Sequence, residues 1–154
     1  MTVDALMNWV GRQAGTVPVH LRTMGDEQPE GVILSLLAVN PLASFEANAL
    51  RLELTYRLTV RLADPVAAHD LLCAIAFAAI GAPDLPAQDG VRARALELLT
   101  PAEARLRHGP PAEPCLHLVV TLERAREGAK ALPVRERVLH TTQTVPRRAA
   151  DAER

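Results

Sequence analysis

The 154-residue chain is 49% apolar and carries a formal net charge of −1, from 17 basic and 18 acidic residues. This composition excludes general disorder, and the charge balance argues against a nucleic-acid-binding domain, which normally has a basic surplus. No apolar run approaches the roughly 18 residues of a membrane span, and the N-terminus lacks the basic and apolar blocks of a signal peptide. We therefore expect a cytoplasmic protein without membrane insertion.

The first third of the chain predicts one short helix and two strands. Residues 2–13 carry apolar side chains at helical spacing, and residues 16–23 alternate weakly, with Pro18 restricting them to an edge strand or an extended arm. The continuous apolar run over residues 32–39 is typical of a strand buried on both faces. The pair Asn40-Pro41 is expected to end it, because a residue before proline avoids the helical region.

Residues 50–62 read L-R-L-E-L-T-Y-R-L-T-V-R-L, with apolar and polar side chains alternating at every position. A period of two indicates a strand with one buried face and one face that meets water or a partner. A helix would scatter the same leucines around its surface. At roughly 3.4 Å per residue the strand would reach about 40 Å, about twice the usual length, so we expect it to organise the sheet.

The polar side of this long strand has two interpretations. It is either a solvated sheet face with partial charge pairing or a subunit interface, where the planar fork of arginine makes bidentate contacts to carboxylates. The candidate interface residues are Arg51, Glu53, Arg57 and Arg61.

Two helix starts are well specified in the second half of the chain. Asp64 as N-cap and Pro65 at the first helical position predict a main helix over residues 65–80. The capping-box pattern of residues 100–103 predicts a short helix that ends near His108-Gly109.

The remaining segments complete the predicted domain. Residues 91–99 and 115–124 alternate as strands do, and residues 134–145 are interpreted as a last extended segment. We expect a single domain over residues 1–146 and a flexible tail over residues 147–154. The predicted fold class is α+β, with a mixed or antiparallel sheet of about four to five strands and with the main helix and the short helices packed on one face.

Motifs that carry chemistry are sparse. The chain has no G-x-S-x-G elbow and no glycine-rich phosphate loop, and Cys73 and Cys115 are expected to be buried thiols. Cys115 and His117 point the same way on a predicted strand, which allows a Cys/His dyad or, with His108 or His69, a metal site. Structural zinc sites need four ligands, usually in close pairs, and only one such pair exists, so we expect no metal. The absence of motifs makes an enzyme less expected but does not exclude one.

Five stretches of the chain follow one another in the order of a known protein family. The run V-I-L-S-L-L-A-V-N-P is similar to an early strand of that family, and its strand pattern L-x-L-x-Y-x-L-x-V and helix pattern A-x-x-L-L-x-x-I are both matched. In this respect the chain resembles the terminator, or cap, proteins of contractile phage tails and of phage-tail-like contractile injection systems. The matching stretches are residues 32–41, 52–60, 67–75, 99–107 and 115–123.

The resemblance implies a structural protein without catalysis or cofactor. Six copies would form a ring on the distal end of a tail tube, end tube and sheath polymerisation, and anchor the terminal sheath layer or, in a phage, the head connector. The expected partners are therefore further copies of the chain, tube proteins and sheath proteins, within a phage or a phage-tail-like particle. A closed ring uses heterologous contacts, and the polar face of residues 50–62 would take part in them.

Two other functions stay open. One is a different α+β assembly module, such as a non-catalytic adaptor, a chaperone or a head–tail joining protein. Co-purification with a single soluble partner in place of tubes would favour it. The other is a small enzyme that uses Cys115 with His117 or His69, which intact activity after alkylation of Cys115 would exclude.

Overall fold

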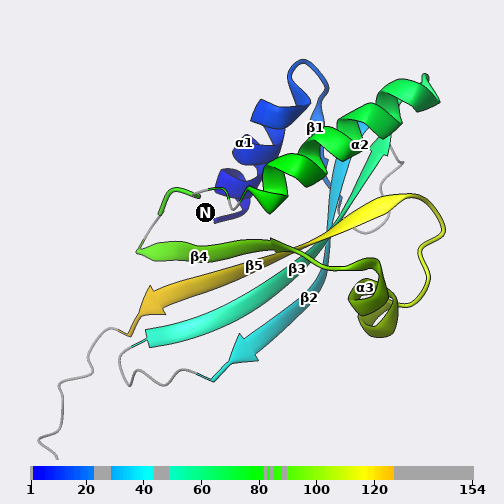
Figure 1. Ribbon diagram of the computed structural model, residues 1–154. Coiled ribbons are helices and arrows are strands. Elements are labelled where there is room, and N and C mark those ends of the chain that lie inside the picture. Colours follow the sequence, from blue (N-terminus) through cyan, green and yellow to red (C-terminus); the bar gives the residue numbers. More distant parts are fainter. Residues whose placement is uncertain are drawn as a thin grey trace, which may run out of the picture.

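The computed structural model describes residues 2–22, 29–43, 49–81, 83, 85–87 and 90–126. They form a five-stranded mixed sheet with three helices, which confirms the predicted α+β class (Figure 1). The strand order is β1-β2-β3-β5-β4; β1 is parallel to β2, and all other pairs are antiparallel. The elements in chain order are α1 (Thr2–Ala14), β1 (Val19–Leu21), β2 (Gly31–Leu42), β3 (Ala49–Arg61), α2 (Pro65–Ile80), β4 (Val91–Leu98), α3 (Pro101–His108) and β5 (Cys115–Ala125).

The long central strand is confirmed as β3, which pairs along its length with β2 on one side and β5 on the other. Tyr56 and Leu58 on β3 are 2% and 0% exposed, and they pack with buried residues of α1 and α2. The alternation of β3 therefore places its apolar side chains on the side of the sheet on which α1 and α2 pack, as the period of two predicts.

The two faces of the sheet are covered by different helices. As predicted, α1 and α2 share one face, where the core contains Leu6, Trp9 and Ile75. The third helix lies on the other face, because its last residue, His108, stacks on His117 of β5. The sequence predicted all helices on one face, so the position of α3 is a correction. The register of β5 places His117 on the other face, and nothing in residues 101–108 reveals that register.

The prediction for the strand over residues 32–39 was partly wrong. The strand continues through Asn40-Pro41 to Leu42, and Leu36 is 48% exposed although the run was expected to be buried on both faces. β1 pairs with β2 only over residues 32–34, so the later part of β2 has a strand neighbour on one side only among the described residues. A proline is tolerated there because no ladder on that side requires its N–H.

The predicted starts of α2 and α3 are confirmed. The Asp64 carboxylate accepts a hydrogen bond from the Val66 backbone N–H at 2.9 Å, and Thr100 and Glu103 form both bonds of a capping box. None of the helices in the described ranges is long and apolar enough to cross a bilayer.

The C-terminal predictions lie outside the described residues. They are the extended segment over residues 134–145, the domain limit at residue 146 and the tail over residues 147–154. All three stay predictions.

Candidate subunit interface

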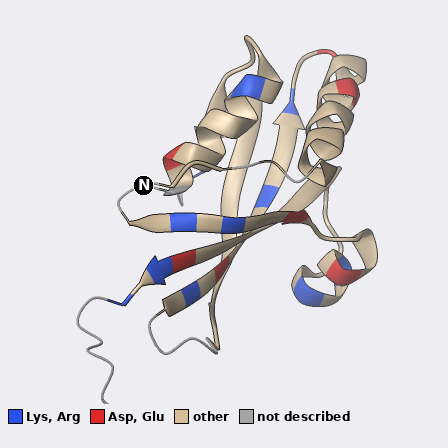
Figure 2. Cartoon of the chain, turned by 60° about the vertical axis from the view of Figure 1, so that its left-hand side comes forward, with Lys and Arg blue, Asp and Glu red and all other residues tan. Residues whose placement is uncertain are grey.

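The sequence-predicted interface residues lie on the sheet face opposite α1 and α2. The register pairs Arg51 with Glu123 and Arg57 with His117, so charged side chains of β3 and β5 share this face. Figure 2 shows that charges also gather on β4, next to β5. The face therefore combines residues from three strands, whereas the sequence predicted interface residues on β3 alone.

Glu123 is the centre of this face. Its carboxylate accepts bonds from Arg51 at 2.9 Å, from Arg92 at 2.6 Å and from Arg94 at 2.8 Å, and the residue is only 7% exposed. The hydrogen bonds from Arg94 and Arg92 lower the pKa of Glu123 from 4.5 to about 2. The carboxylate is thus ionised at any physiological pH and holds three guanidinium groups in place.

The charge that this cluster displays comes mainly from β4. The side chains of Arg92 and Arg94 are 58% and 41% exposed, against 23% for Arg51. In the sequence, Arg92 and Arg94 indicate only that residues 91–99 form a strand. Cross-strand proximity to Glu123, which decides their role, depends on the pairing of β4 with β5.

The other predicted interface residues also make contacts within the protomer. Arg61 bonds Glu113 at 2.9 Å, and Glu53 accepts from Asn40 at 3.2 Å and from Arg107 at 3.4 Å. The solvated, partly paired face and the interface were alternatives in the sequence. The ion pairs within the protomer favour the solvated, partly paired face for β3. The exposed guanidinium groups of β4 leave the subunit interface as a candidate.

Arg57 lies beneath α3 and differs from the other arginines. Among the described residues its buried Nε atom has no hydrogen-bond partner, and the same holds for Nε2 of His108. The rings of His108 and His117 stack in parallel with centroids 5.5 Å apart. Three basic side chains therefore meet where α3 packs on the sheet.

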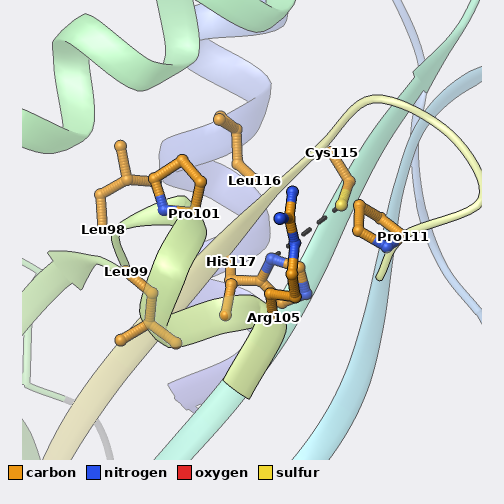
Figure 3. Close-up of a pocket in the computed structure, with 9 residues that line it drawn as sticks. Leu98, Leu99, Pro101, Arg105, Pro111, Cys115, Leu116 and His117 are labelled. Carbon is orange, nitrogen blue, oxygen red and sulfur yellow. Dashed lines mark hydrogen bonds between the residues drawn. The ribbon is translucent and has the colours of Figure 1, made fainter. Parts of the chain in front are cut away.

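Burial and basic neighbours change the chemistry of β5 at this point. The pKa of His117 is lowered by burial and by the positive charge of His108 and Arg57, and burial raises the pKa of the Cys115 thiol. The two side chains line a cavity of about 160 Å³ with Arg105, and Cys115 Sγ lies 3.9 Å from His117 Nδ1 (Figure 3). A neutral thiol beside a neutral imidazole is the reverse of the thiolate–imidazolium pair that a cysteine nucleophile needs.

The stacked histidines lack the further ligands of a metal site among the described residues. The described residues hold no group of three or more histidine, cysteine, aspartate or glutamate side chains placed to bind an ion. His69, the other histidine considered, lies on α2 with its Nε2 3.6 Å from Cys73 Sγ, away from the pair on α3 and β5.

The lowered pKa of His117 predicts an acid-sensitive fold. The unfolded chain binds a proton at this histidine below about pH 6.5, whereas the folded chain resists it, so stability falls as the pH drops below about 6.5. Urea unfolding across this range should show the loss, and His117→Gln should flatten it. The matched control is exchange of the exposed His69 for Gln, after which the loss assigned to His117 should persist.

The comparisons with known proteins concern the fold. No protein-family model matches the chain, and no curated protein matches it. Among solved structures it is similar to the PVC sheath/tube terminator of an extracellular contractile injection system, determined in the extended state, with a TM-score of 0.52 and 14% sequence identity. The likeness covers 80% of this chain and 55% of the terminator, so the chain spans about half the length of that structure. The chain therefore has the fold of a contractile injection system terminator, as its sequence resemblance predicted.

Proposed function

We propose that this chain is a terminator subunit, a structural protein that forms a ring at the end of a tail tube, ends the polymerisation of tube and sheath, and anchors the last sheath layer. The observation that carries the proposal is the likeness to a sheath/tube terminator over 80% of the chain. The sequence resemblance rests on separate observations, the order and pattern of five stretches, and it points to the same family.

The physical character of the surface supports a structural role. The histidine and cysteine of the 160 Å³ cavity are held in their neutral forms, which are poorly suited to nucleophilic chemistry. The charged face presents arginines that are fixed by Glu123 and remain exposed on β4. Preorganised guanidinium groups suit contacts to carboxylates of a protein partner.

Images of particles made with and without this chain test the proposal. Negative-stain micrographs of the deletion strain should contain overlong, uncapped tubes, and a plasmid copy of the gene should restore a single tube length. Unchanged tube length in the deletion strain contradicts the proposal. Recovery of the chain with one soluble partner and never on particles would indicate an adaptor instead.

A further inference from the structure

Among the described residues, none covers an apolar surface at the end of the sheet that lies farthest from α1 and α2. Leu36, Val39, Leu50 and Leu52 are 48%, 52%, 53% and 40% exposed. Leu36 lies opposite Tyr56 and Val39 opposite Leu54, so they share the face on which the helices pack. We call these four residues the sheet-end patch; Figure 1 shows the ends of β2 and β3 extending beyond both helices.

A second apolar surface runs along the outside of α2. Val66, Phe77 and Ile80 are 66%, 76% and 68% exposed. At about 100° per residue they lie within a narrow arc of the helix, and we call them the α2 stripe. α2 is apolar on all sides, with Asp70 its only acidic residue, and a helix of that kind is normally covered all round.

The lengths of the elements explain why the sheet-end patch is exposed. A 13-residue strand such as β3 extends over about 40 Å, whereas a 16-residue helix such as α2 covers about 24 Å. The helical layer is therefore too short for the sheet that it covers. A further apolar helix would extend the layer that already packs on this face.

Charges of opposite sign lie beside the two surfaces. Arg124 of β5 lies opposite Leu50 of β3 in the register, so it is on the same face as the sheet-end patch, and it is exposed. Asp70 lies on the exposed side of α2 between Val66 and Phe77. The α2 stripe therefore has one carboxylate beside it, and the sheet-end patch has one guanidinium beside it.

We propose that a second copy of this chain covers the sheet-end patch with its α2 stripe. The two surfaces are different and lie on different parts of the protomer, so the contact is heterologous, and each copy keeps one of them for the next neighbour. In the ring of the proposed function, this contact would join neighbouring subunits. Only the closure of the ring rests on the proposed function.

Two surface variants and a mixing experiment test the contact. Leu50→Asp spoils only the sheet-end patch and Phe77→Asp spoils only the α2 stripe, and each should weaken self-association at least about a hundredfold because a carboxylate is buried without a partner. Analytical ultracentrifugation should show each variant as a monomer. An equimolar mixture should form one-to-one dimers that do not grow, because one intact contact remains in each pair. The matched control is Leu106→Asp on α3, whose leucine is 88% exposed and belongs to neither surface; it should associate like the wild type.

Three results would overturn the proposal: a wild-type chain that stays monomeric at all concentrations, single variants that associate like the wild type, or a mixture that stays monomeric. Melting curves by circular dichroism ensure that the variants are folded. As a second readout, Asp70→Arg and Arg124→Asp should each weaken association, and the chain with both changes should recover it. Tube length in the deletion strain is scored separately, so a failed terminator function and a failed contact give different results.

Discussion

Replacing Glu123 with glutamine is expected to lower the melting temperature more than loss of any other single ion pair of the described residues. The variant keeps the shape of the side chain but leaves Arg51, Arg92 and Arg94 close together without the carboxylate that they share. Repulsion among these three cations should loosen β4 from β5, most of all at low ionic strength where screening is weak. Thermal unfolding at low and high salt measures both effects.

The matched control for this variant is Glu113→Gln. Glu113 pairs with Arg61 alone, and both side chains are 38% exposed, so its loss should cost about 0–1 kcal/mol. Equal melting temperatures for the two variants would contradict the central role of Glu123.

The same residue sets a second pH window. The pKa of Glu123 is lowered from 4.5 to about 2 in the folded chain, so its stabilising contribution is complete above pH 4.5 and is lost as the pH falls towards 2. Glu123→Gln should remove that acid-dependent loss. The window lies below that of His117, so the two can be separated in one titration of stability against pH.

Leu58→Ala is expected to destabilise the fold by about 2–5 kcal/mol, because it removes a large side chain from the centre of the core. Leu58 is 0% exposed and lies between Leu34 of β2 and Leu116 of β5, on the face covered by the helices. The melting temperature of a domain of this size should fall by roughly 2–4 °C for each kcal/mol. Urea unfolding monitored by circular dichroism provides the free energy.

The control for the core variant is Leu106→Ala. This leucine of α3 is 88% exposed, so its truncation should change stability by no more than about 0.5 kcal/mol. A small loss for Leu58→Ala, similar to that of the control, would mean that β3 is not the centre of the core.

Local features of the sequence were sufficient to predict the elements. The alternation of residues 50–62 predicts β3, and Asp64 and Thr100 predict the starts of α2 and α3, because strand periodicity and helix caps depend on residues only a few positions apart. The order of these elements was also sufficient for the resemblance to a terminator family, which the solved structure supports at the level of fold.

Packing between distant segments decided what each face of the sheet does. Alternation alone predicts that Leu50 is as buried as Leu58, yet Leu50 is 53% exposed because the helices end before they reach it. Glu123 gathers three arginines only because β5 lies between β3 and β4. Periodicity determines which side of a strand a residue occupies, whereas the register and the length of the covering layer, which involve residues far apart in the chain, determine what that side contacts.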